Sequence, residues 1–247
     1  MTEQTPEDET RTEEEQEREP RDAAYWARYA ETLKVSGVAE GATNINVDGR
    51  RAVGPLQGFG KMWQKTYRVR LVGAEVTPAE VIETWKTRYQ DFWPEGNQFY
   101  APLAGIAPGE VALISGSLPG GVKLSTGVMV LYADDESFTL MTPQGHPFSG
   151  WITFSSYEVD DATVVQAQVL MRANDPLYEM GLRMGGHRME DEVWQKTLEN
   201  LAAHFGVDGP VETNVVCVDP KLQWRQYGNV WHNAGIRSAL HSMTAPL

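Results

Sequence analysis

His146 occupies a tight turn, TPQGHP, between two segments that alternate apolar and polar residues. A glycine and two prolines restrict the backbone there, so the imidazole is held in one place. Such a histidine could act as an acid, a base or a hydrogen-bonding group for a ligand. It could equally be a turn residue that bonds only to nearby backbone, because no catalytic partner is visible in the sequence. His146 is therefore a candidate for catalysis or ligand binding, and the structural alternative stays open.

A second group of polar residues opens the longest helical pattern of the chain, in GGHRMEDE. His187, Glu190 and Asp191 stand at i, i+3 and i+4, a spacing that puts them on one helix face and could gather metal ligands. Acidic residues in a first turn also stabilise the positive end of a helix without any metal. Because the sequence contains no HExxH or CxxC motif, we expect no metal site and no cofactor. His187 remains a candidate for ligand binding.

Other chemistry-bearing motifs are sparse. The sequence has no GxSxG, and GFGKM lacks the spacing of phosphate-binding loops. The single cysteine, Cys217, stands in the apolar run NVVCVD, where a buried inert thiol is expected. Arg172 begins the polar stretch RANDPLYEMGLR and is the second candidate for a catalytic or ligand-anchoring residue. The Asp175-Pro176 pair in that stretch is also what a capped helix start requires.

Charge and composition limit the function classes. The 247 residues carry a net charge of −13, and residues 1–22 alone hold ten Asp or Glu against three Arg. This tail has too little apolar surface to fold, so we predict that it is disordered. The rest has no basic stripe, which argues against a nucleic-acid partner. An acidic N-terminus, one cysteine and the lack of a long apolar run predict a cytoplasmic protein without a membrane span.

The residues before the candidate sites predict two helices and one strand. The segment 22–37 places its aromatic residues and Leu33 on one helical face, and a glycine-rich connector follows it. Alternation predicts a strand at Thr66–Gly73. Thr77, Pro78 and Glu80 form a capping-box pattern, which predicts a helix that ends near Trp93.

The middle of the chain predicts a run of antiparallel strands. The strands are expected at Val111–Leu118, Gly127–Tyr132, Ser137–Met141, Trp151–Glu158 and Thr163–Arg172. The connections are short, so neighbouring strands must pair antiparallel. A short helical or irregular piece then leads into a long amphipathic helix at His187–Phe205, and one more strand is expected at Thr213–Val218.

This order of elements resembles the helix-grip fold of the START/birch-pollen-allergen superfamily, also called SRPBCC. The resemblance spans about Lys65 to Val207 and includes the phrases FTLMTPQGHPFSGWITFS and RANDPLYEMGLRMGGHRMEDEVW, which are similar to those of uncharacterised bacterial members. It implies an α+β fold in which a curved antiparallel sheet wraps around a long C-terminal helix and encloses an apolar cavity. It supplies no catalytic residues, and the N-terminal helix and the C-terminal extension depart from the minimal pattern.

The chain is accordingly divided into an acidic tail (1–22), an N-terminal helix and connector (23–57), a helix-grip ligand-binding domain (58–207) and a C-terminal extension packed on that domain (208–247). Aromatic and methionine side chains would give the cavity adaptable apolar walls, although any of them could instead pack the core. The ligand-binding candidates are Trp85, Met129, Met141, His146, Trp151, Met171, Arg172, His187 and Trp194.

We expect the protein to bind a small hydrophobic or amphipathic molecule inside the cavity. One alternative is an enzyme on the same fold that resembles polyketide cyclases or aromatases, with His146 or Arg172 as the acting group. Another is an interaction protein whose cavity is filled. In that case the aromatic C-terminal segment QWRQYGNVWHNAGIRSALH would dock a protein partner or a second copy of the chain.

Overall fold

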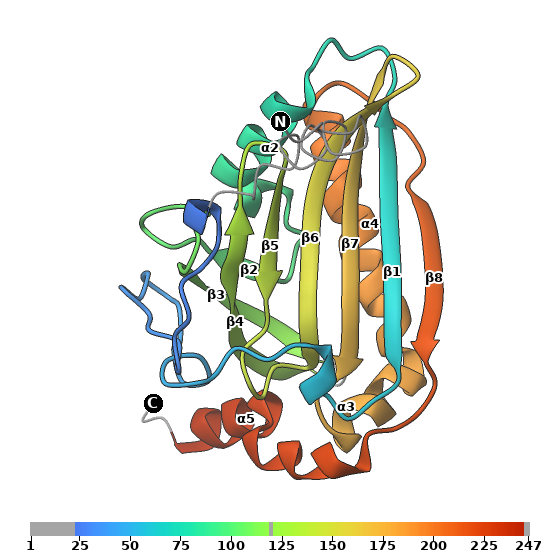
Figure 1. Ribbon diagram of the computed structural model, residues 1–247. Helices are drawn as coiled ribbons and strands as arrows, with labels where there is room; N and C mark the ends of the chain where they lie inside the picture. Colours follow the sequence, from blue (N-terminus) through green and yellow to red (C-terminus); the bar gives the residue numbers. More distant parts are fainter. Residues whose placement is uncertain (1–22, 119–120, 245–247) are drawn as a thin grey trace, which may run out of the picture.

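A single curved antiparallel sheet and one long helix dominate the structure, a computed structural model that describes residues 23–118 and 121–244 (Figure 1). The predicted disordered tail, 1–22, lies outside the described residues. The eight strands follow the order β2-β3-β4-β5-β6-β7-β1-β8. Their bounds are β1 (Met62–Leu71), β2 (Gln98–Tyr100), β3 (Val111–Leu118), β4 (Val122–Ala133), β5 (Ser137–Met141), β6 (Phe148–Val159), β7 (Ala162–Ala173) and β8 (Glu212–Asp219).

The helices lie mainly on the concave side of the sheet and at its two ends. The long helix α4 runs along β7 and β1, α2 lies near one end of the molecule, and α3 and α5 lie at the other end (Figure 1). Their bounds are α2 (Pro78–Thr87), α3 (Pro176–Gly181), α4 (His187–His204) and α5 (Ala234–Thr244), with short turns η1 (Ala23–Tyr25), η2 (Pro55–Gln57), η3 (Tyr89–Phe92), η4 (Leu182–Gly186) and η5 (Trp224–His232). The predicted α+β helix-grip fold is confirmed, with β2 as a strand that the sequence did not indicate.

The hydrophobic core fills the part of the space between the sheet and α4 that lies next to α2. This helix starts where expected, because the Thr77 hydroxyl accepts the Glu80 backbone N–H at 3.3 Å and the Glu80 carboxylate accepts the Thr77 N–H at 2.8 Å. It buries Trp85 completely, and the indole packs against the rings of Phe138 and Phe154. Across from it, α4 buries Leu198, Leu201 and Ala202. This packing leaves the opposite half of the grip open for a cavity.

The predicted N-terminal helix over 22–37 is wrong: within the described residues, helical geometry there is limited to the turn Ala23–Tyr25. The backbone bonds elsewhere instead, since the Ala27 N–H donates to the Leu131 carbonyl on β4 at 2.8 Å. The segment crosses the convex face of the sheet and buries Leu33 in a small apolar cluster with Met129. Of the residues that suggested a helix, Leu33 is buried against the sheet, whereas Tyr29 is 94% exposed.

The C-terminal residues add an edge strand and two helical segments. β8 pairs with β1, and each residue from Glu212 to Val218 is exposed. Cys217 is therefore exposed and not buried as expected, because an edge strand has a neighbour on one side only. After β8, η5 and α5 pass under the end of the sheet (Figure 1). No helix among the described residues is long and apolar enough to cross a membrane.

Candidate functional site

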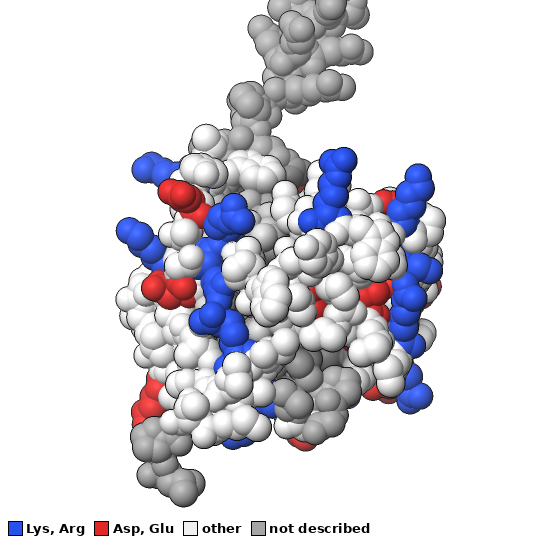
Figure 2. Space-filling model, turned by 90° about the horizontal axis from the view of Figure 1, so that it is seen from below, with Lys and Arg blue, Asp and Glu red and all other residues white. Residues whose placement is uncertain are grey.

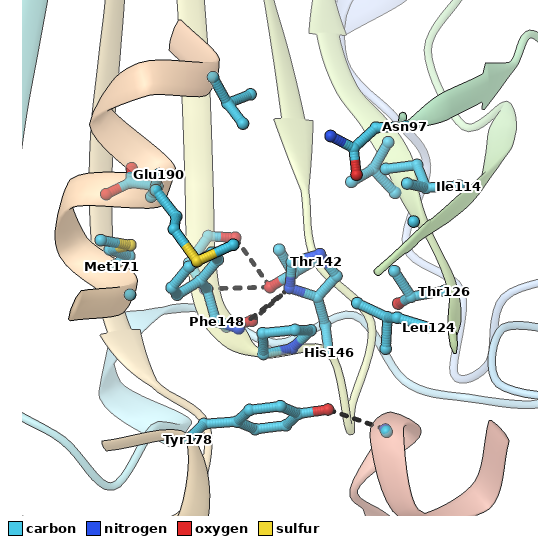
Figure 3. A pocket seen from close by; sticks show the side chains of 18 of the residues that line it. Asn97, Ile114, Leu124, Thr126, Thr142, His146, Phe148, Met171, Tyr178 and Glu190 are labelled. Carbon is cyan, nitrogen blue, oxygen red and sulfur yellow. Dashed lines mark hydrogen bonds between the residues drawn. The ribbon is translucent and has the colours of Figure 1, made fainter. Parts of the chain in front are cut away.

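A cavity of about 640 Å³ lies between the concave face of the sheet and α4, bounded at one end by α3 and α5 (Figure 3). Strands β3 to β7 contribute inward-facing side chains because alternate residues of a strand point to the same face. Most of the wall is apolar. The apolar residues include Phe99, Ile114, Leu124, Val128, Leu140, Phe148, Ile152, Val169, Met171, Leu177, Leu182, Met189, Val193, Trp194 and Ile236.

Four of the nine predicted ligand-binding residues border this cavity: His146, Trp151, Met171 and Trp194. His146 comes from the turn between β5 and β6, and Met171 from β7. Trp194 projects from α4 and packs edge-to-face on Trp93. Trp151 borders the cavity between Gly150 and Ile152, while its ring also lies beside Gly54 in the segment before η2.

Three predicted wall residues lie elsewhere for reasons of packing. Trp85 is in the core beyond the end of the cavity, with no exposed surface. Met129 points to the convex face, because its neighbour Val128 takes the concave side of β4. Met141 packs against that same convex cluster. An apolar strand residue can be buried on either face here, since the N-terminal segment covers the convex side.

The two predicted polar wall residues Arg172 and His187 also lie outside the cavity lining. Arg172 follows Met171 on β7 and points to the other face, where it donates to the Gly60 carbonyl at 2.6 Å and to the Asp219 carboxylate at 2.5 Å. It joins β7 to the segment before β1 and to the end of β8. His187 lies with its ring against Trp63, with 5.0 Å between the ring centroids. Both side chains thus have structural contacts.

Several cavity residues escaped the sequence analysis. Tyr89 and Asn97 come from the segment after α2, where Tyr89 continues the apolar spacing of that helix and Asn97 follows a proline-glycine turn. Tyr178 on α3 meets the C-terminal segment, because its hydroxyl accepts the Gly235 N–H at 2.9 Å. That contact brings α5 to the cavity, although nothing in the sequence of α5 signals it. The missed residues come together only in the folded structure and share no sequence motif.

His146 is held in a defined orientation. Its Nδ1 lies 3.0 Å from the Phe148 backbone nitrogen and 3.1 Å from the Phe148 carbonyl oxygen. In one neutral tautomer Nδ1 accepts the N–H and Nε2 carries the proton; in the other, Nδ1–H donates to the carbonyl and Nε2 is an acceptor. Gly145 makes the turn possible: its φ is +93°, and a Cβ there would lie 2.1 Å from the His232 carbonyl. Burial lowers the pKa of His146 to about 4, although the Phe148 backbone opposes this shift. The imidazole is therefore a neutral hydrogen-bonding group near pH 7.

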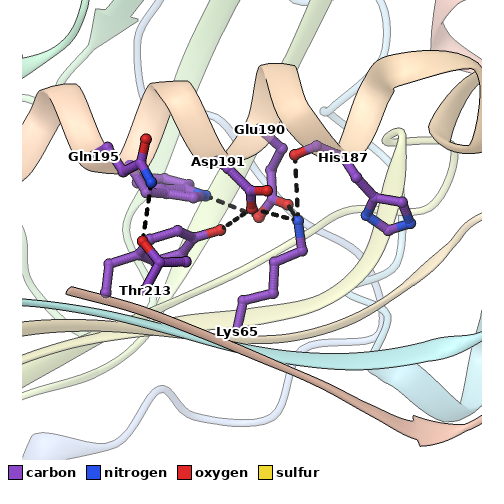
Figure 4. Close-up of polar contacts among 8 residues, drawn as sticks. Lys65, His187, Glu190, Asp191, Gln195 and Thr213 are labelled. Carbon is purple, nitrogen blue, oxygen red and sulfur yellow. Dashed lines mark hydrogen bonds and ion pairs between the residues drawn. The ribbon is translucent and has the colours of Figure 1, made fainter. Parts of the chain in front are cut away.

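A buried ionic network lies beside the cavity, between β1 and α4 (Figure 4). The Lys65 ammonium, 1% exposed, donates to the Glu190 carboxylate and, at 2.6 Å, to that of Asp191. The Tyr67 hydroxyl donates to Asp191 at 2.6 Å, and the Trp194 indole N–H donates to Glu190 at 3.1 Å. The acidic pair thus binds a lysine, and His187 turns away from it. Among the described residues, no group of His, Cys, Asp and Glu is arranged to hold a metal ion.

Glu190 makes stability depend on pH. Burial raises the pKa of Glu190 to about 7 and outweighs the opposing effect of the Lys65 ammonium, while the negative charge of Asp191 adds a smaller increase. The folded state therefore keeps a proton that the unfolded chain releases near pH 4.5, the ordinary pKa of a glutamate side chain. Folding must lose stability as pH rises from about 4.5 to about 7. We expect the melting temperature of Glu190→Gln, relative to wild type, to increase across this range.

His146 and His187 both have a pKa near 4, so they make stability rise with pH over the same range. Because both histidines are present in wild type and in the variant, comparing the two proteins at each pH isolates the contribution of Glu190. Glu199→Gln is the control, because Glu199 lies at the surface of α4 in an exposed pair with Lys196. Its melting temperature should differ from that of wild type by the same amount at pH 5 and pH 8. A flat difference for Glu190→Gln would contradict the raised pKa.

The C-terminal aromatic segment divides between cavity and surface. Asn233 and Ile236 border the cavity, whereas Trp224, Tyr227 and Trp231 are 63–82% exposed. This segment carries Lys221, Arg225 and Arg237 without any acidic residue after Asp219. Figure 2, which views this end of the molecule, shows basic side chains separated by uncharged surface. Docking of a protein partner or a second copy here stays a prediction.

No protein-family model and no curated protein matches the chain. Among solved structures, the chain is similar to Ara h 8.0201 (11% identity, TM-score 0.43, 60% of this chain and 99% of that chain). It is also similar to protein Ms6760 from Mycobacterium smegmatis (13%, 0.42, 58% and 90%). A third is the di-domain ARO/CYC StfQ from the steffimycin biosynthetic pathway (10%, 0.42, 60% and 53%). At these identities the likeness concerns the fold alone.

Proposed function

We propose that the protein binds a small, mainly apolar molecule in the cavity between the sheet and α4. The observation that supports this proposal is an apolar-walled space of about 640 Å³ inside the grip, within the size range of small-molecule sites. Each 100 Å² of apolar ligand surface buried there would contribute about 2.5 kcal/mol before the costs of binding. This space argues against the alternative of an interaction protein whose cavity is filled by its own side chains.

A route to the cavity is present at the end near α5. Leu177 on α3, Met189 on α4 and Ile236 on α5 border the cavity, and they are 45%, 44% and 43% exposed. The wall therefore reaches the molecular surface between these three helices. A ligand could enter there without unfolding the sheet.

Filling the cavity should abolish binding. Val193→Trp on α4 and Ile114→Trp on β3 each add a bulky ring to an opposite wall of the cavity. We expect each variant to weaken the binding of N-phenyl-1-naphthylamine, a neutral fluorescent probe, by about tenfold or more, because the new ring occupies the space that the probe needs. Fluorescence titration measures the dissociation constant.

The matched control is Glu192→Trp, which adds the same ring next to Val193 at an exposed position on α4. It should bind the probe as wild type does. In wild type, a hundredfold excess of probe over its dissociation constant should also raise stability by about 2.7 kcal/mol. The proposal fails if wild type binds no apolar probe, or if the filled variants bind as tightly as the control.

A further inference from the structure

Several polar groups at the cavity have hydrogen-bonding capacity that no described protein atom uses. The Tyr89 hydroxyl, the Trp93 indole N–H and the Thr126 hydroxyl are buried without a partner in the described part of the chain, and two further groups lie on separate walls. One is Nε2 of His146, since both contacts of this ring involve Nδ1. The other is the side-chain amide of Asn97, which has no hydrogen-bond partner among the described residues. Both residues border the cavity and approach it from different walls (Figure 3). The cavity thus offers hydrogen bonds to whatever it encloses.

A glycine on the neighbouring strand leaves room for Asn97. A Cβ at Gly116 of β3 would lie 2.5 Å from the Asn97 Oδ1, so a larger residue there would displace the amide. The turn around Gly145 fixes the backbone at His146, as described above. A fixed imidazole lowers the entropy cost of binding a ligand group.

The charges at the wall limit the ligand further. Among the described residues that border the cavity, none is lysine or arginine, and Glu190 is the one acidic residue. Its carboxylate already accepts from Lys65 and Trp194. A carboxylate or phosphate on the ligand would therefore enter a largely apolar space without a cation to pair with, at a cost of several kcal/mol.

We infer that the cavity selects an uncharged, mainly apolar molecule that carries an oxygen acceptor such as a carbonyl. The Asn97 amide binds this acceptor together with the Nε2–H of His146, in the tautomer whose Nδ1 accepts the Phe148 N–H. This inference rests on the proposed function, because it names the ligand class of the same cavity. Because the two donors lie on different walls, they can bind the same ligand oxygen or two separate oxygens of one ligand. Fatty acids and other anionic amphiphiles are disfavoured.

Three naphthalenes of similar size separate the ligand classes: 2-acetylnaphthalene carries a ketone, 2-isopropylnaphthalene is its hydrocarbon counterpart, and 2-naphthoate is an anion. We expect the ketone to bind wild type about 5- to 15-fold more tightly than the hydrocarbon, as one net hydrogen bond provides. The anion should bind at least about tenfold more weakly than the ketone. Displacement of N-phenyl-1-naphthylamine at pH 7.5 measures all three affinities.

Two variants assign the preference to residues. In His146→Asn, the Asn oxygen can still accept the Phe148 N–H while the Nε2–H is lost, and Asn97→Leu removes the amide at similar size. We expect the ketone preference to fall to about twofold or less in the double variant, with the hydrocarbon affinity changed by less than about threefold. His204→Asn, an equal change at an exposed position on α4, should behave as wild type.

The outcomes separate this inference from the proposed function. Equal binding of ketone and hydrocarbon by wild type, tight binding of the anion, or a ketone preference that survives the double variant would each overturn the inference and leave a binding cavity. If none of the three compounds displaces the probe and the probe itself does not bind, the proposed function fails.

Discussion

Lys65→Met should lower the free energy of unfolding by about 3–5 kcal/mol, as expected when one partner of a buried ion pair is removed. Lys65 is 1% exposed and is the cation that Glu190 and Asp191 share. Methionine fills a similar volume, so the loss comes from charge and not from a void. Without the ammonium, the carboxylates of Glu190 and Asp191 lie next to each other between β1 and α4 with no cation to pair with. The loss of unfolding free energy should grow with pH because Glu190 ionises.

Denaturant unfolding at pH 6 and pH 8 measures this loss. Lys196→Met is the matched control: Lys196 pairs with Glu199 on the exposed side of α4, and surface pairs of this kind contribute little. The double variant Lys65→Met/Glu190→Gln should recover part of the stability, because it removes one of the unpaired charges. A loss for Lys65→Met no larger than for the control would show that the network does not hold α4 against β1.

Trp85→Ala should cost about 3–5 kcal/mol, the usual range for a large aromatic residue truncated in a core. Trp85 has no exposed surface and packs with its ring centroid 4.7 Å from that of Phe154. Its removal leaves a void between α2 and the sheet that close-packed neighbours cannot fill. Trp194→Ala should cost less, because part of that indole already borders the cavity.

The two tryptophan variants are compared by thermal and denaturant unfolding. The expected order is a large loss for Trp85→Ala and a smaller one for Trp194→Ala. Probe binding should change more in Trp194→Ala than in Trp85→Ala, because Trp194 forms part of the cavity wall and Trp85 does not. Greater destabilisation by Trp194→Ala would mean that the face of α4 around Trp194 is core and that the cavity is smaller than described.

The fold could be predicted from the sequence because strand signals were local. Alternation and short turns located β3 and β5 at their observed bounds and β6 and β7 within a few residues. Thr77 and Glu80 located the start of α2 through a capping box that needs no tertiary contact. β2 was missed, since a strand of three residues carries too few positions for a pattern.

The cavity wall was harder to predict, because period-two alternation does not say which face of a strand is concave. Val128 and Met129 are both buried, the first at the cavity and the second beneath the N-terminal segment. That segment gave a false helix signal, so the cover on the convex face was not foreseen. Arg172 was misplaced for the same reason, because Met171 and Arg172 are adjacent and face opposite ways.

The position of β1 has a consequence for how the chain is made. β1 pairs with β7 on one side and with β8 on the other, strands that lie about 100 and 150 residues later, so these contacts form slowly compared with local hairpins. During synthesis at about 5–20 residues per second, β1 therefore waits several seconds without a partner. The hairpins from β3 to β7 can form meanwhile, each next to its neighbour in the chain. The sheet is complete around α4 only when β1 pairs with β7 and β8. Until these strands are made, the unpaired β1 leaves the new chain most exposed to aggregation.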